Sequence, residues 1–99
     1  LSIEKGTQRI QAGWDLDRLI RRVCLYCGIK EEQLAQKARA NDLSLAKALI
    51  CFWGSRELNL SLREIAHRLA ISQPATSQWV ERGREYCREL EIDFEVIDT

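Results

Sequence analysis

The chain has 99 residues, of which 45% are hydrophobic, with only one Pro and five Gly. This composition fits one small domain with a real core and excludes a disordered chain. Fifteen basic and fifteen acidic residues cancel, which argues against a strongly basic nucleic-acid binder. No apolar run approaches the length of a membrane span, and no secretory signal opens the chain. Because the chain starts at Leu1 and contains no Met, we expect it to be a piece of a larger protein.

The first third of the chain predicts one clear helix. Residues 1–13 predict a linker or a short, weakly held helix. A helix then starts at Asp15 or Asp17 and runs to about Cys27, because apolar residues recur at the spacing of one helical face. Gly28 suits the left-handed position that ends such a helix. Trp14 precedes the cap and is expected to pack back onto this helix.

A short helix, a basic connection and a long central helix are predicted next. Residues 30–32 open the short helix, with two acids near its N-terminus. Residues 37–41 form the basic connection. A third helix is capped by Asp42 or Ser44 and runs from about Leu45 to Leu58. Its segment ALICFW is apolar nearly all round, so we expect this helix at the centre of the fold.

Four cysteines at positions 24, 27, 51 and 87 invite two interpretations. The C-x-x-C spacing of Cys24 and Cys27 is compatible with a zinc site. However, both residues lie in a helical pattern without a loop suited to tetrahedral ligation, so buried free thiols are favoured. Free thiols without a secretory signal predict a cytoplasmic protein. The single His67 is expected on the surface, and neither a metal nor any other cofactor is expected.

The segment LREIAHRLAISQPATSQW, residues 62–79, predicts two helices joined by a short turn at residues 70–72. Ile65, Leu69, Ile71 and Trp79 supply apolar residues for their packing, and a small Ala66 stands where the helices cross. Ser72 is a good N-cap for the second helix, and proline is tolerated in the first turn that follows. The second helix is expected to continue to about residue 90.

This pattern is typical of a helix-turn-helix, which places its second helix in the major groove of DNA. Polar and mostly uncharged side chains would contact base edges from that helix; they are Gln73, Pro74, Ser77 and Gln78. An ordinary αα-hairpin has the same periodicity and remains the alternative. The tail, residues 91–99, alternates apolar and acidic residues. A short strand, a clamp across the fold and a contact to a second chain are all compatible with it.

Over residues 19–80 the chain resembles the C-terminal DNA-binding domain of the bacterial replication initiator DnaA. The resemblance is carried by LYCGIKEEQL, by QKAR, and by ALICFWGSRELNLSLREIAHRL. It departs at residues 72–75, where SQPA replaces the family's origin-reading signature. A second helix that begins in this way is similar to that of the domain appended to REP-associated tyrosine transposases. The resemblance implies an all-α bundle of about five helices, like that of the initiator or of the Trp repressor, within residues 14–90.

The resemblance also implies a basic loop and helix start that contact DNA, through Arg39 and Lys47. With other basic residues, the set expected at phosphates or in the minor groove is Lys37, Arg39, Lys47, Arg63 and Arg82. We therefore expect a sequence-preferring domain for double-stranded DNA in a transposase-like protein. A transcription regulator, an initiator-like domain and a protein-interaction module are the alternatives. An enzyme, a membrane contact and a small-molecule substrate are not expected, and a homodimer is a further alternative, since single domains of this kind often need one.

Overall fold

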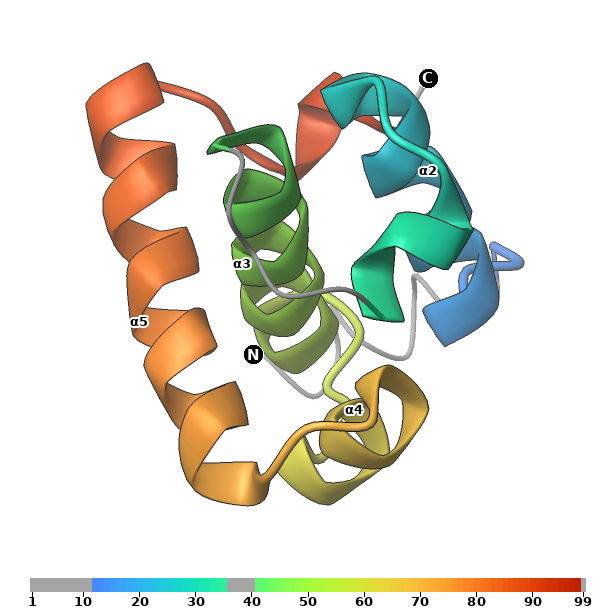
Figure 1. Cartoon of the computed structure of the whole chain (residues 1–99). Coiled ribbons are helices and arrows are strands. Elements are labelled where there is room, and N and C mark those ends of the chain that lie inside the picture. Colours follow the sequence, from blue (N-terminus) through green and yellow to red (C-terminus); the bar gives the residue numbers. More distant parts are fainter. Residues whose placement is uncertain (1–11, 36–40, 99) are drawn as a thin grey trace.

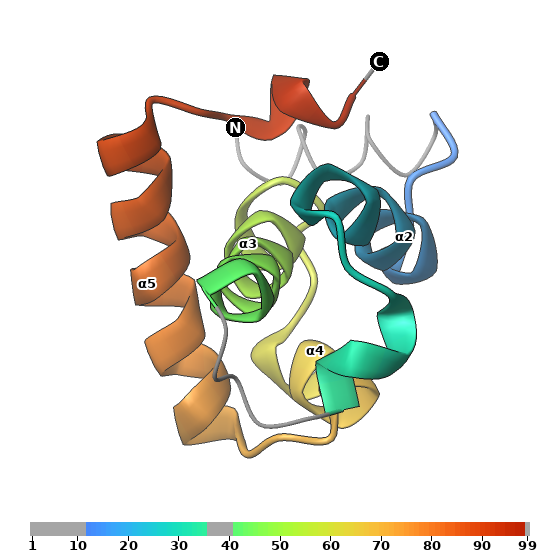
Figure 2. The ribbon, with the colours of Figure 1, turned by 45° about the horizontal axis from the view of Figure 1, so that its top comes forward.

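The computed structural model describes residues 12–35 and 41–98, and every regular element in these ranges is helical. There are four α-helices and two short 3-10 helices. The all-α prediction is therefore confirmed. Helix α3 lies between α5 on one side and α2 on the other, and α4 closes the end at which α5 begins (Figures 1 and 2).

Helix α2 spans Leu16–Cys27, within the bounds that its sequence predicts. The Asp15 carboxylate accepts a hydrogen bond from the Arg18 backbone N–H at 2.8 Å, which fixes the first turn. Gly28 ends the helix at a φ of 72°, where its N–H reaches two carbonyls of the last turn. Trp14 contacts this helix as predicted, since the Arg18 guanidinium lies 4.4 Å from its ring centre, and the buried ring also packs on Phe94 of the C-terminal tail.

The short helix η1 spans Glu31–Ala35 and is followed, beyond residues 36–40, by α3 at Asn41–Arg56. The prediction placed the start of α3 near Leu45 and was wrong by about one turn. Asp42 lies inside the first turn, where an acid favours the helix N-terminus, and Leu43 is already buried. The central position of α3 is confirmed, since nearly every residue from 46 to 54 is buried.

Helices α4 (Leu62–Leu69) and α5 (Gln73–Leu90) are joined by residues 70–72, as predicted. The Ser61 hydroxyl caps α4 by accepting from the Glu64 N–H at 3.1 Å. Ala70 ends α4 in the left-handed region, at a φ of 57°. The Ser72 hydroxyl then caps α5 by accepting from the Ala75 N–H at 3.2 Å. Both caps are local, which explains why the sequence locates these boundaries well.

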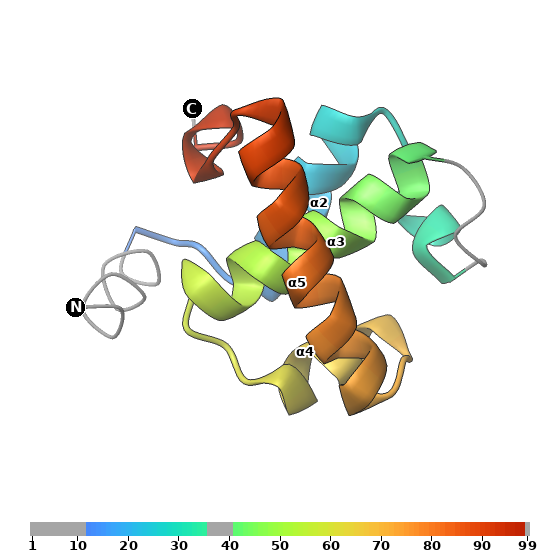
Figure 3. The same ribbon diagram turned by 90° about the vertical axis from the view of Figure 1, so that its left-hand side faces the viewer.

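Helix α5 crosses over α3 (Figure 3). Gly83 is buried there, and a Cβ at this position would collide with the Ala48 carbonyl oxygen and with Phe52 Cβ. The sequence signal is a glycine inside a helical pattern, which marks a close backbone approach. This contact fixes how the first half of α5 projects from the body.

The tail closes the fold as a clamp, which is one of the three forms compatible with its sequence. Its 3-10 helix η2 spans Phe94–Val96, and Phe94 and Ile97 are buried. The Phe94 ring meets the rings of Trp14 and Trp53 edge-on, at centroid distances of 4.8 and 5.9 Å. These contacts join the two ends of the described chain to the central helix, so the tail is part of the packed body.

Candidate nucleic-acid interface

The side chains predicted to contact bases share one exposed face of α5. Gln73, Pro74, Ser77 and Gln78 are all exposed. Their spacing places them together with the exposed Glu81, because residues three and four apart are neighbours on a helix. We call these five residues the α5 polar face. It is uncharged except for Glu81, and it lies at the beginning of the helix, next to α4 (Figure 1).

The opposite side of the same helix segment is held in the core. Thr76 is fully buried, and its hydroxyl donates a hydrogen bond to the Ser72 carbonyl at 2.9 Å. Val80, one turn later, is also buried. This bond satisfies the buried hydroxyl within the first turn of α5 and involves none of the exposed side chains of the α5 polar face. Its side chains remain available for an external partner.

Helix α4 and the turn support the start of α5 from below. Ile65, Ala66 and Leu69 are buried, as expected for the packing face of α4. The Ile71 N–H donates to the Ala66 carbonyl at 3.0 Å, which holds the turn against α4. His67 lies on the exposed side, as predicted.

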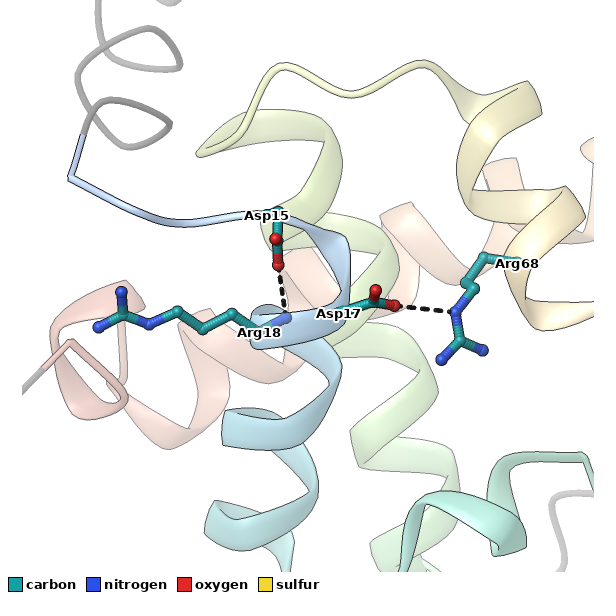
Figure 4. Close-up of polar contacts among 4 residues, drawn as sticks. All are labelled: Asp15, Asp17, Arg18 and Arg68. Carbon is teal, nitrogen blue, oxygen red and sulfur yellow. Dashed lines mark hydrogen bonds and ion pairs between the residues drawn. The ribbon is translucent and has the colours of Figure 1, made fainter.

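An ion pair that the sequence analysis missed ties α4 to α2. Arg68 Nε lies 3.2 Å from a carboxylate oxygen of Asp17, and both side chains are substantially exposed (Figure 4). An exposed pair of this kind contributes at most about 1 kcal/mol. The partners are 51 positions apart in the sequence, so no local spacing signals the contact. Arg68 is therefore engaged within the protein in this arrangement.

The basic residues predicted to contact phosphates fall into three groups. Arg63 and Arg82 are exposed on α4 and α5. The Arg82 guanidinium lies 5.4 Å from the ring centre of Trp79, which packs against the core as its register predicts. Lys37 and Arg39 lie outside the described residues.

Lys47 is the exception among these basic residues. Only 7% of its surface is exposed, and burial lowers the pKa of its ammonium group. Lys47 lies in the middle of the packed α3, and not at the start of the helix where the resemblance placed it, which explains its burial. Because so little of Lys47 is accessible, we leave it out of the proposed interface.

The α5 polar face also carries an acidic group that repels phosphates. A carboxylate oxygen of Glu81 lies 3.4 Å from Arg84 Nε, one turn along the helix. This pair partly neutralises Glu81, although both side chains are accessible to solvent. The chain as a whole carries no net charge. Its electrostatic attraction to DNA is therefore weak, and the polar contacts of α5 would have to supply more of the affinity.

No disulfide joins the four cysteines. Burial raises the thiol pKa to about 11 for Cys24 and Cys87 and to about 12 for Cys27 and Cys51. The thiolate is the form that attacks electrophiles and binds zinc, so these neutral thiols are inert at neutral pH. Across the part of the chain that the structure describes, no three His, Cys, Asp or Glu side chains are placed to hold a metal ion.

None of the helices within residues 12–35 and 41–98 is both long enough and apolar enough to cross a membrane.

Comparisons with known proteins give no relative. The chain matches no protein-family model, no curated protein and no solved structure. The resemblance to the initiator domain therefore stays a prediction based on the residues quoted for it. Conclusions about function depend on the geometry of α4, α5 and the turn between them.

Proposed function

We propose that this chain binds double-stranded DNA with a sequence preference, using α4 and α5 as a helix-turn-helix. The single observation that carries the proposal is the α5 polar face, which projects from a helix whose other side is anchored at Thr76, Val80 and Gly83. An α-helix fits the major groove of B-DNA, where polar side chains distinguish base pairs. Helix α4 would cross the backbone beside it.

Each polar residue has a role in this proposal. Gln73 and Gln78 each present an amide, which pairs in a bidentate manner with adenine. Ser77 lies between them and can hydrogen-bond to more than one base. Arg63 and Arg82 flank this surface on α4 and α5 and would contact phosphates, which positions a protein without specifying sequence. Pro74 contributes a rigid apolar contact without a backbone donor.

We further propose that the chain is the accessory DNA-recognition domain of a transposase-like protein. The support for this context is the sequence resemblance at residues 72–75 alone. A transcription regulator or an initiator-like domain would use the same surface, so the DNA-binding proposal does not depend on the choice between them. The site selected by the domain would separate them, because transposon ends, promoters and origins differ in where that site occurs.

A protein-interaction module is the second candidate function. The zero net charge of the chain and its acidic tail favour it, as do the exposed apolar side chains of Leu25 and Tyr26. It predicts no retention of DNA at any salt concentration. The two candidates therefore differ in a simple binding experiment.

The experiment is selection of random duplex DNA by the 99-residue chain, followed by sequencing, at low and moderate salt. Wild type is expected to enrich one short motif. A Gln78→Ala variant is expected to change the preferred base at about one position, at a cost of about 1–3 kcal/mol for the original site. A Glu89→Ala variant, changed on the same helix but far from its start, is the matched control and should select the wild-type motif.

The basic loop is tested separately. An Arg39→Ala variant is expected to weaken binding to all sequences and to reduce the salt dependence, because one phosphate contact is lost. If Arg39 instead enters a narrow minor groove, the loss will be confined to A·T-rich sites. An exposed arginine on α2, changed in Arg21→Ala, serves as the control for loss of charge alone. Unchanged binding by both the Gln78 and Arg39 variants would contradict the proposed docking.

A further inference from the structure

Glu81 is the charged member of the α5 polar face, and its hydrogen-bonding chemistry differs from that of its neighbours. The amides of Gln73 and Gln78 and the hydroxyl of Ser77 both donate and accept hydrogen bonds, whereas an ionised carboxylate only accepts. Phosphates repel such a group. A carboxylate on a surface that binds DNA therefore lies outside the contact or meets a base that donates to it.

The helical geometry places Glu81 within the proposed contact. It lies one turn after Ser77 and Gln78 on the same exposed side of α5. At a rise of 1.5 Å per residue, its Cα lies about 12 Å along the helix from that of Gln73, which is comparable to the width of the major groove. Glu85 is also exposed but lies about 6 Å farther along the helix. Glu81 is therefore the acid that the groove would enclose.

Arg84 holds the Glu81 carboxylate in place. Arg84 Nε lies 3.4 Å from Glu81 Oε2, and its guanidinium lies 6.0 Å from the ring centre of Phe52 in α3. This Nε is buried, and no atom among the described residues accepts a hydrogen bond from it. The carboxylate is therefore the group that compensates the buried side of the cation. The Glu81 side chain is still 65% exposed, so it keeps acceptor sites for an external donor.

We propose that Glu81 is a specificity-determining residue that selects a cytosine in the DNA site. The inference rests on the proposed DNA binding. In the major groove, cytosine presents an amino donor and no acceptor. Guanine and thymine present acceptors, and adenine presents an acceptor beside its donor. A side chain that only accepts is therefore satisfied by cytosine and repelled by the alternatives.

The same charge lowers affinity and raises specificity. Repulsion between Glu81 and the phosphates weakens binding to every sequence alike, and the hydrogen bond to cytosine offsets it only at the correct site. One helical turn separates Glu81 from Gln78, and successive bases are 3.4 Å apart. The selected cytosine therefore lies within about two base pairs of the adenine that Gln78 would contact.

Selection of random duplexes by the 99-residue chain, followed by titration of four duplexes that differ at one position, tests the proposal. Wild type is expected to prefer cytosine there by about tenfold. Glu81→Ala should abolish this preference, and Glu81→Gln should move it towards adenine, because an amide also donates. Glu85→Gln removes the same charge one turn later and should keep the wild-type preference. Circular dichroism would verify that the variants are folded.

Arg84 acts through Glu81, as a positioning residue, and base preference separates this role from a structural one. Arg84→Gln is expected to weaken the preference for cytosine at that one position and to leave the other positions of the motif unchanged. Arg84→Lys keeps a cation beside the carboxylate and should restore part of the preference. An Arg84→Gln variant with the full wild-type preference would overturn the positioning role.

The outcomes separate this inference from the proposal on which it rests. If wild type enriches no motif, the DNA-binding proposal fails and the role of Glu81 fails with it. If wild type enriches a motif that Glu81→Ala and Glu81→Gln select unchanged, only the role of Glu81 is overturned. An equal change of base preference in Glu85→Gln would assign the effect to net charge and would also overturn that role.

Discussion

The two halves of α5 differ in what their side chains contact. Around Gly83 the helix lies so close to α3 that no Cβ fits between them. At Gln73 to Gln78 the same helix exposes polar side chains and keeps only Thr76 buried. Changes at Gly83 should therefore alter folding, and changes at Gln73, Ser77 or Gln78 should alter binding with little effect on folding. This separation is what the DNA-binding proposal requires.

The largest expected effect is at the crossing of α3 and α5. Gly83→Ala gains helix propensity of about 1 kcal/mol, but its methyl group collides with backbone and side chain of α3. Overpacking of this kind costs about 1–3 kcal/mol, so we expect a net loss of stability. Thermal unfolding should show a lower midpoint than wild type. A Ser77→Ala variant on the exposed side should unfold at nearly the wild-type temperature.

The next largest effect is expected at Ser72, the N-cap residue of α5. Ser72→Ala removes the hydroxyl that caps α5 and is expected to cost about 1 kcal/mol. Chemical denaturation would measure this loss as a lower midpoint with an unchanged slope. Ser72→Asp keeps an acceptor at the cap and should recover most of the stability. No loss in Ser72→Ala would show that the cap does not hold the start of α5.

A gain in stability is expected from a change at Ala70, the C-cap residue of α4. Ala70 adopts a left-handed conformation, with a φ of 57°, which costs an L-residue with a Cβ about 1 kcal/mol. Ala70→Gly relieves this cost and is expected to raise stability, although part of the gain is lost to the greater freedom of the unfolded chain. Equilibrium denaturation would detect the higher midpoint. A midpoint below that of wild type would mean that the methyl group contributes to packing.

The smallest effect is at the acid of the α5 polar face. Glu81→Gln removes a negative charge next to the proposed DNA and is expected to raise affinity for random duplexes by about fivefold at low salt. The gain should disappear as salt is raised. Binding would be followed by fluorescence anisotropy of a labelled duplex. An equal gain from Glu89→Gln, farther along α5, would show that net charge alone matters and that Glu81 does not face the DNA.

The parts of the fold that follow from local signals could be predicted from the sequence. Asp15, Gly28 and Ser72 act on backbone groups within four residues, so the bounds of α2 and the start of α5 are well predicted. The exposure of the four predicted base-contacting residues follows in the same way from their helical spacing. The start of α3 was missed because Asp42 and Ser44, which are typical N-cap residues, lie inside the helix and not before it.

Features that depend on distant parts of the chain could not be predicted. Phe94 is buried because the rings of Trp14 and Trp53 pack against it, and both residues lie far from Phe94 in the sequence. Lys47 is buried because α3 is covered on several sides, which a single helix does not reveal. The Arg68–Asp17 ion pair has the same origin. Tertiary packing decides all three, and no local pattern encodes it.

The central claim is that the α5 polar face is the surface that binds DNA, and amide NMR tests it most directly. A random-sequence duplex would be titrated into the isotope-labelled chain at low salt. The account predicts shifts at Gln73, Ser77 and Gln78, with none at Leu25 in α2 or Val96 in η2. Spectra that do not change, or shifts confined to Leu25, Val96 and their neighbours, would contradict it.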